Sequence, residues 1–546
     1  MRLKCILLLI VISLFLITCS TQQENNRIII GIASDIETLN PLYSFTVEEG
    51  NITELLYLSL IENDWDSAKG DIQYSPMLAK SWEWKDNENA VVIELRDDVK
   101  WSDGLPCTIE DVIFSFDVYS DPTVKSRAYG YFDNFYTDEK GHIDSAKTFE
   151  VLDKNRLKIK FKKESEAELL DIDHPILPKH YWSKYKRNEL SQINLKDSVI
   201  TNGAYLLKRW YRGGAIILAK NQTSFLINHK TVDEIIFKVI PEYRNRLSQL
   251  MAGDIDLMED IKTDDISNIR QNESIIIAPV SGRDFDYIGW NNISVSKYEA
   301  GKIVPNKLFG NAKVRRALTI ALNRNAVVTQ YLKGFGQLAS TPVSPIFKSI
   351  YNSAVVPMQY RPLLAKKMLK EEGWFDSNHD GTIDKNGVEF QFTLHIPAGN
   401  PRRSFAASLF QNNLKEVGID MTIATDELGV FIDNLFAKKY EAWMAAWVIP
   451  IPINLKISWY SDLETTPFNF ASFQNYELDK LLDKLSGADK GEKKIIYYKI
   501  QEILADEQPY TFLYWIDNIV AYNKRVKNIS ADPLGTIKHC WQWQLN

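Results

Sequence analysis

The stretch VVIELRDDVKWSDGLPCTIEDVIFSF, residues 91–116, decides how the rest of the chain is interpreted. The apolar run at its start predicts a strand. Asp103-Gly104 is a typical turn pair. Thr108 followed three residues later by Asp111 resembles a capping box, with Asp in place of Glu. A helix therefore begins after Thr108, and it turns three apolar side chains inward: Val112, Ile113 and Phe116.

Strand and helix patterns alternate on both sides of this stretch. Short apolar or alternating runs at 27–33, 155–163 and 388–396 predict strands. Apolar residues at helical spacing predict helices over 363–374 and 476–485. Because the two patterns interleave along the whole chain, the fold class is α/β rather than an all-β sandwich.

A further helix begins near Lys313. Its apolar residues share one face, which predicts packing against a core: Val314, Ala317, Leu318, Ala321 and Leu322. Four polar residues lie off that apolar face: Arg315, Arg316, Asn323 and Arg324.

Several segments, taken in order, carry a resemblance to a known family. Residues 91–116 closely resemble a signature of family 5 extracellular solute-binding proteins, the dipeptide-, oligopeptide- and nickel-binding receptors of ABC importers. Further stretches resemble motifs of this family in the family's own order: IASDIETLNPL (32–42), NGAYLLKRWYRGGAIILAKN (202–221), LSQLMAGDIDL (247–257), LFGNAKVRRALTIALNR (308–324) and NYELDKLLDKL (475–485). Ala204 stands where the family usually has Pro.

The resemblance implies a two-lobed periplasmic-binding-protein fold of Venus-flytrap shape, with an extra subdomain in the first lobe. Ligand binds in the cleft between the lobes, and hinge closure buries it. We therefore expect this division of the chain: signal peptide 1–18, lipidated tether 19–26, lobe I 27–68, its extra subdomain 69–199, lobe I again 200–278, lobe II 279–505 and a C-terminal return to lobe I 506–546.

The N-terminus predicts export and anchoring. Arg2 and Lys4 precede an apolar run over 5–17, which is too short to span a bilayer and is typical of a secretory signal. Residues 16–19, LITC, resemble the lipobox of bacterial lipoproteins, although Thr18 stands where Gly, Ala or Ser is usual. The resemblance implies lipidation of Cys19; ordinary signal cleavage is the alternative. We expect the protein in the cell envelope, in the periplasm or on the extracellular face, lipid-anchored to a membrane.

The stretch AWMAAWVIPIPINLKISWYSD, residues 442–462, departs from the family pattern. Peptide receptors of this family usually carry a Trp followed closely by an Asp that holds the ligand's ammonium group. Trp447 aligns with that Trp, but residues 448–454 contain no acid, and Pro450 stands about where the Asp is expected. Either this anchor is lost or the alignment slips locally. We predict that Trp447 contacts the ligand, which is a peptide by family default, or otherwise an N-blocked peptide, a sugar or another neutral molecule.

Other predicted ligand contacts come from loops that face the cleft in the family. Tyr43, Ser44 and Phe45 follow the first strand, and Asn291 and Asn292 end the strand YIGWNN. Loop packing is the alternative for all five residues.

One loop resembles a calcium site in part. Asp376, Asn378 and Asp380 match positions 1, 3 and 5 of a calcium-binding loop. Gly387 stands at position 12, where a bidentate Glu is needed. A plain surface loop is favoured, and we expect no metal and no cofactor.

Composition and motifs narrow the function class. The net charge of −7, without any basic run, argues against nucleic-acid binding. No GxSxG, HExxH or Walker A sequence occurs, so we expect a binding protein rather than an enzyme. A hydrolase with two carboxylates, an oligosaccharide receptor and a non-transport adhesive lipoprotein remain as alternatives. The expected partners are a peptide or other small solute and the permease subunits of an ABC transporter, with the protein itself a monomer.

Two cysteines lie beyond the N-terminal segment. Cys107 and Cys540 could form a disulfide in an oxidising compartment, or remain as two buried free thiols. The sequence leaves both possibilities open.

Overall fold

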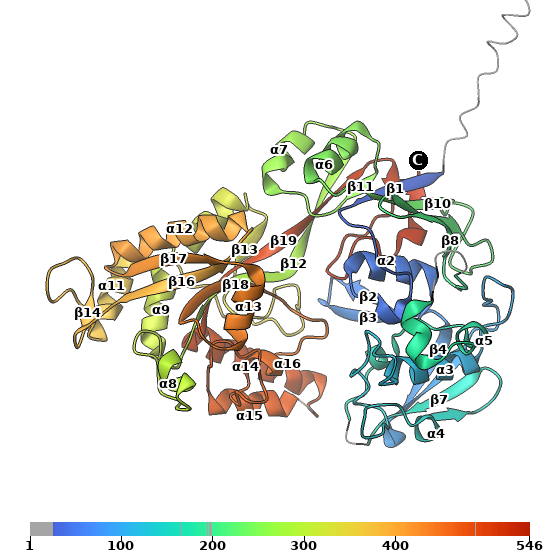
Figure 1. The fold of residues 1–546 in the computed structure, drawn as a ribbon, viewed down its shortest axis with the longest axis horizontal. Coiled ribbons are helices and arrows are strands. Elements are labelled where there is room, and N and C mark those ends of the chain that lie inside the picture. Colours follow the sequence, from blue (N-terminus) through green and yellow to red (C-terminus); the bar gives the residue numbers. More distant parts are fainter. Residues whose placement is uncertain (1–25, 164, 194, 196–198, 486) are drawn as a thin grey trace, which may run out of the picture.

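Two long strands, β12 (Ile275–Trp290) and β19 (Tyr510–Asn523), run through both halves of the molecule and join them (Figure 1). They pair antiparallel along most of their length. The computed structural model describes residues 26–163, 165–193, 195, 199–485 and 487–546. The two halves are the lobes of a two-lobed periplasmic-binding-protein fold.

The central sheet extends from one lobe into the other through this strand pair. Its order is β17-β16-β18-β12-β19-β11-β1-β10-β9-β8, with β13 added beside β19. The lobe II strands are β17 (Asp420–Asp426), β16 (Gln391–Pro397), β18 (Ala442–Val448) and β13 (Gly336–Leu338). The lobe I strands are β11 (Leu257–Met258), β1 (Arg27–Ile32), β10 (Glu234–Val239), β9 (Ala215–Lys220) and β8 (Tyr205–Tyr211).

The extra subdomain of lobe I has its own sheet. It also contains the helix cap predicted at Thr108, which the structure confirms. The strands are β4 (Ala79–Lys85), β5 (Ala90–Leu95), β7 (Arg156–Lys160) and β6 (Phe149–Val151). Helix α3 (Ile109–Ser120) begins directly after Thr108, whose backbone N–H donates to the Asp111 carboxylate at 2.8 Å. Of its predicted inward residues, Val112 and Phe116 are buried and Ile113 is half-buried.

Helices cover the sheet in lobe II and at the hinge. The lobe II helices are α8 (Val295–Glu299), α9 (Ala312–Ala321), α10 (Arg324–Ala326), α11 (Pro362–Glu371), α12 (Pro401–Glu416), α13 (Leu428–Phe436), α14 (Lys456–Trp459), α15 (Tyr476–Leu485) and α16 (Lys490–Glu507). Lobe I and the hinge carry α2 (Val47–Leu56), α4 (Ser145–Thr148), α5 (Lys179–Trp182), α6 (Tyr243–Ala252) and α7 (Ile266–Ile269). Short hairpins complete the fold: β2 (Ile61–Asp66) with β3 (Asp71–Pro76), β14 (Asp384–Lys385) with β15 (Val388–Glu389), and β20 (Val526–Lys527) with β21 (Gln544–Leu545).

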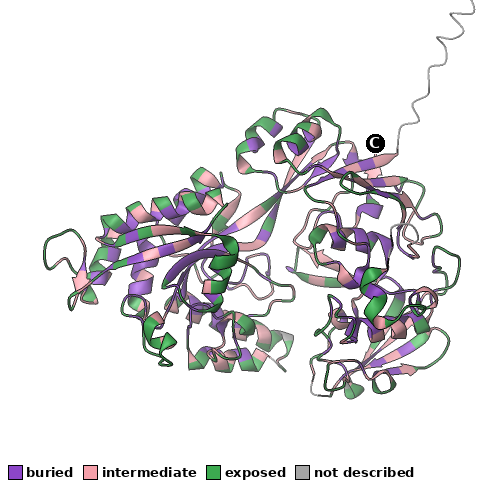
Figure 2. Cartoon of the chain, viewed as in Figure 1, coloured by how far each residue is buried: buried purple, intermediate pink, exposed green. Residues whose placement is uncertain are grey.

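Each lobe has its own hydrophobic core (Figure 2). Lobe I and its extra subdomain share one continuous cluster of buried side chains, whereas lobe II has two clusters, one on each side of its sheet. The core residues of β19 up to Trp515 pack in lobe II, and Ile519 and Ala521 pack in the hinge cluster. Strand β19 therefore carries core residues of both lobe II and the hinge.

The lobes also touch away from the strand pair. The turn between β2 and β3 reaches lobe II, where Trp65 meets the edge of Phe347 with ring centroids 5.8 Å apart. Lys348 Nζ donates to the Ser67 carbonyl at 2.5 Å.

Gly70 is required at this contact by sterics. It has φ +64°, and a Cβ there would lie 2.1 Å from the Ile346 carbonyl oxygen. A second bridge joins Lys493 of α16 to Glu166 of the extra subdomain at 3.3 Å. The lobes are therefore in contact on the side opposite the hinge sheet as well.

The two remaining cysteines are buried and free: Cys107 and Cys540 do not form the disulfide that the sequence left open. The predicted signal peptide, the lipidation at Cys19 and most of the tether lie outside the described residues. No helix in the described part of the chain is long and apolar enough to cross a membrane.

Candidate ligand-binding site

A cavity of about 200 Å³ lies in lobe II at the end of β18. The strand itself provides Trp447 and Val448, and the segment after it provides Ile449 and Pro450. Hinge strand β12 contributes Phe285. The remaining wall comes from Pro342 and from residues between 454 and 459: Asn454, Leu455, Ile457, Ser458 and Trp459.

Trp447 forms one wall of this cavity and is held by aromatic packing. Its ring stacks on Phe470 at 5.8 Å, with 13° between the planes, and meets Phe468 at 6.0 Å. The indole Nε1 is buried and has no hydrogen-bond partner among the described residues. The ring is therefore positioned by stacking, which leaves part of it at the cavity surface. Ligand contact by Trp447 stays a prediction that this location supports.

The segment after Trp447 carries no charge into the cavity. Val448 is 55% exposed, and Pro450 is exposed beside it. Arg283 of β12 donates a hydrogen bond from its guanidinium to the Ile449 carbonyl at 2.9 Å. Burial lowers the pKa of Arg283, against the opposing charge of Asp284. A cation thus bonds the Ile449 carbonyl, while the acidic residue Asp284 is paired with Val448 across β12 and β18.

One edge of β18 is unpaired next to the cavity. On one side the strand pairs with β12 from Ala442 to Val448. On the other side it pairs with β16 only at Ala442 and Trp443. Alternate peptide groups of residues 444–448 consequently face away from β12 without a partner strand in the described chain. Such an edge can pair with an extended peptide.

The predicted contacts after the first strand lie in different environments. Phe45 is 71% exposed, and Tyr43 is half-buried with its hydroxyl donating to the Val124 carbonyl at 2.7 Å. Ser44 is buried, and its hydroxyl bonds the Asn40 carbonyl and Thr53 Oγ1. Phe45 therefore remains the most accessible candidate of the three, whereas Ser44 fits the loop-packing alternative.

The predicted contacts at the end of β12 are used inside lobe II. Asn291 is fully buried, and its side-chain amide donates to the Tyr440 carbonyl at 3.1 Å. The Asn292 amide donates to the Trp290 and Ala471 carbonyls at 2.9 and 3.1 Å. Loop packing accounts for both side chains, because their donors bind backbone groups that would otherwise lack partners.

The loop that resembles a calcium site is closed by its own hydrogen bonds. Asp376 accepts from the backbone N–H groups of Asp380 and Gly381 at 3.2 and 3.0 Å. Asn378 Nδ2 donates to Asp380 at 2.7 Å. These are the bonds of an Asx-rich turn.

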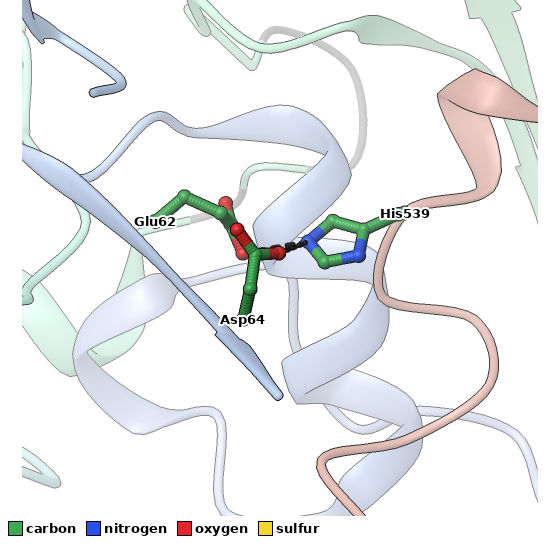
Figure 3. Close-up of side chains that lie close together, drawn as sticks. All are labelled: Glu62, Asp64 and His539. Atoms are coloured by element: carbon green, nitrogen blue, oxygen red, sulfur yellow. Dashed lines mark hydrogen bonds and ion pairs between the residues drawn. The ribbon is translucent and has the colours of Figure 1, made fainter. Parts of the chain in front are cut away.

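Lobe I contains a charged cluster that the sequence analysis missed (Figure 3). Glu62 and Asp64, both on β2, point toward His539 of the C-terminal segment. His539 Nε2 lies 3.0 Å from Glu62 Oε1 and 3.2 Å from Asp64 Oδ1. Lys538 Nζ lies 3.0 Å from the same Glu62 oxygen. We call Glu62, Asp64, Lys538 and His539 the lobe I charge cluster.

Each charge in this cluster is compensated by another. Burial alone would lower the pKa of His539, but the hydrogen bond and charge of Glu62 raise it above its usual value. Burial alone would raise the pKa of Glu62, but His539 and Lys538 lower it. One ligand atom each from Glu62, Asp64 and His539 lies within reach of a common metal ion, yet Lys538 and His539 already contact the Glu62 carboxylate. We interpret the cluster as an ion-pair network that fixes the C-terminal segment to β2.

No local pattern could have revealed this cluster, because about 475 residues separate its two halves.

A larger polar hollow of about 670 Å³ lies elsewhere in lobe II, lined by Asn306, Lys307, Glu389 and Glu441 among others. The cavity at Trp447 is the stronger candidate for the ligand site. It is apolar and adjoins hinge strand β12, as ligand pockets between domains do.

Comparisons with known proteins identify the family of this chain. The model of the bacterial extracellular solute-binding proteins, family 5, matches residues 73–463. The chain belongs to this family. It is 28% identical to the oligopeptide-binding protein AppA of Bacillus subtilis, across 98% of this chain and 97% of that protein. It is 23% identical to the probable D,D-dipeptide-binding periplasmic protein DdpA of Escherichia coli, across 93% and 92% of the two chains.

Solved structures of the family have the same architecture. B. subtilis AppA in complex with a nonapeptide superposes with a TM-score of 0.70 at 27% identity, covering 95% of this chain and 99% of that one. NikZ of Campylobacter jejuni in complex with Ni(L-His) gives a TM-score of 0.70 at 23% identity, with the same coverage. The chain therefore has the fold of family 5 solute-binding proteins, a family of binding proteins rather than enzymes.

Proposed function

We propose that this protein is the substrate-binding component of an ABC importer, tethered to a membrane by a lipid on Cys19. It captures a peptide or similar small solute between its lobes and delivers it to the permease. The relatives named for oligopeptide and dipeptide binding support the solute class. The observation that carries the proposal is the unpaired edge of β18 directly beside the Trp447 cavity.

This edge supports a peptide over other solutes for a physical reason. An extended peptide satisfies its main-chain groups against a free strand edge regardless of its sequence, and a neighbouring pocket then receives one side chain. A two-lobed receptor adds closure, so the bound ligand is desolvated between the lobes. A ligand that binds only the folded protein raises its unfolding free energy by about 2.7 kcal/mol at a hundredfold excess over Kd.

The test is a thermal-shift screen of the purified protein against a mixed tetrapeptide library, with oligosaccharides as the comparison set. We expect a concentration-dependent rise in Tm with peptides. Calorimetry on the peptides that shift Tm then gives Kd. A rise with oligosaccharides alone contradicts the peptide proposal and favours a sugar receptor of the same fold.

The anchor is tested separately. In cells that express the full chain, Cys19→Ser should move the protein from the membrane fraction to the soluble envelope fraction. Ser20→Ala, next to the lipidated position, is the matched control and should stay in the membrane fraction. Membrane retention of Cys19→Ser would overturn the lipid anchor and leave peptide capture untouched.

A further inference from the structure

The walls of the Trp447 cavity are apolar. None of the described residues that line it has an ionisable side chain, and its polar side chains are Asn454 and Ser458. The greater part of the wall is aromatic or aliphatic: Phe285, Val448, Ile449, Leu455, Ile457 and Trp459. A charged ligand group placed here would lose hydration without gaining an opposite charge, which is costly.

Two opposite charges, Arg283 and Asp284, lie beside the cavity without lining it. Arg283 precedes Asp284 on β12, beside an irregularity in the pairing of β12 with β19, and Asp284 is paired with Val448 of β18. The Arg283 guanidinium bonds the Ile449 carbonyl, one residue before Pro450. The two charges oppose each other, so the discrimination against a ligand ammonium comes from the cavity wall, which offers it no counter-charge.

The size of the cavity limits what it can hold. Sites that enclose a whole small ligand run from about 300 to 1,000 Å³, and this cavity measures about 200 Å³. It is large enough for one side chain. The rest of a ligand would extend past Val448 and Pro450, which are exposed at the end of β18.

We propose that the Trp447 cavity is a selectivity subsite that receives one uncharged apolar side chain of the ligand, aliphatic or aromatic, and rejects a cationic group. This rests on the proposed function, since it names the class of peptide that the same site accepts. Pro450 is its selectivity residue, because a carboxylate at that position would supply the negative charge that the cavity wall lacks.

A positional scan tests the subsite. Tetra-alanine is compared by calorimetry with four peptides that carry a single Leu and four that carry a single Lys, one at each position. At one position Leu should tighten binding about tenfold or more over Ala, as expected for burying an aliphatic side chain. Lys at that position should weaken binding by at least the same factor.

Two variants of one residue separate charge from shape. Pro450→Asp should reduce the Leu-over-Lys ratio at the selected position at least tenfold, because the new carboxylate compensates the ligand cation. Pro450→Asn removes the same ring without adding charge, and it should keep the ratio of the original protein. Tm of both variants without peptide checks that the fold is retained.

The outcomes distinguish this inference from the proposed function. Binding of the peptides with equal affinity for Leu and Lys at every position overturns the apolar subsite and leaves peptide capture standing. A ratio that falls equally in Pro450→Asp and Pro450→Asn also overturns it, since charge would then have no part. If no peptide of the set binds, the peptide function itself fails.

Discussion

The Trp447 cavity and the lobe I charge cluster differ in the charge and the pairing of their side chains. The cavity has apolar walls without ionisable groups, and its Trp447 Nε1 has no partner among the described residues. In the cluster, Glu62 meets both Lys538 and His539. Charged groups that already form ion pairs with each other gain little free energy from contact with a ligand. An apolar cavity wall gains free energy when a ligand removes it from water. The comparison teaches that a charged group of side chains can be explained by internal ion pairing, while an apolar cavity is the candidate binding site.

The largest expected effect is a difference in stability between variants of the two tryptophans in the cavity wall. Trp459→Ala should lower the free energy of unfolding by about 3–5 kcal/mol, because this side chain is fully buried against Tyr510 and Phe512. Trp447→Ala should cost less stability, because its ring is only partly buried, while it should weaken peptide binding. Urea denaturation and calorimetry measure the two quantities. Equal stability losses without any change in affinity would make Trp447 a core residue.

Breaking the charge cluster should have the next largest effect. Glu62→Gln removes the carboxylate that both Lys538 and His539 contact, and we expect a loss of about 2–4 kcal/mol in unfolding free energy. Lys69→Gln, in an exposed pair with Asp66, is the control and should leave stability unchanged within error. Peptide affinity should not change in either variant. A strong loss of affinity in Glu62→Gln with intact stability would place the cluster in the binding site.

The contact between the lobes is tested by a matched pair of glycines. Gly70→Ala places a Cβ against the Ile346 carbonyl, so the β2–β3 turn should separate from lobe II. Gly104→Ala is also at positive φ but has open space around it, so both variants share a backbone cost of about 1–2 kcal/mol. Small-angle scattering of the unliganded protein should show a larger radius of gyration for Gly70→Ala alone. Identical radii for the two variants would show that the contact does not set the spacing of the lobes.

The smallest effect is a pH dependence of the charge cluster. The folded pKa of His539 is raised, so its contribution to stability is complete below the unfolded pKa of about 6.5 and is lost as pH rises through the folded value. The folded pKa of Glu62 is lowered, so its contribution is present above about 4.5 and is lost as pH falls through the folded value. The cluster should therefore stabilise most between these limits.

Denaturation at pH 6 and pH 8 measures the change. His539→Gln should show a smaller loss between the two values than the original protein. His229→Gln, at an exposed loop position and outside the ion pairs of the cluster, is the control and should reproduce the original pH dependence. An unaltered profile in His539→Gln would show that His539 does not titrate in this range.

Several features of the fold could be predicted from local patterns because they depend on neighbours in the chain. The cap of α3 needs only Thr108 and Asp111, three residues apart. The apolar face of α9 needs only helical spacing, and its five predicted residues are all buried. The arginines of that region could not be placed in the same way. Arg315 is 2% exposed although it lies off the apolar face, because its guanidinium donates to the Phe309, Glu507 and Gln508 carbonyls.

For the candidate site too, some features follow from the sequence and others from contacts between distant segments. The sequence alone determined the α/β class, the family resemblance, the position of Trp447 and the absence of an acid between residues 448 and 454, since these are properties of composition, spacing and order. Only the tertiary structure decided that Phe285 and Trp459 complete a cavity with Trp447, that Asn291 is consumed by packing, and that His539 meets Glu62. Those contacts join segments far apart in the chain, and their free energy comes from desolvation and pairing that exist only once the lobes are assembled.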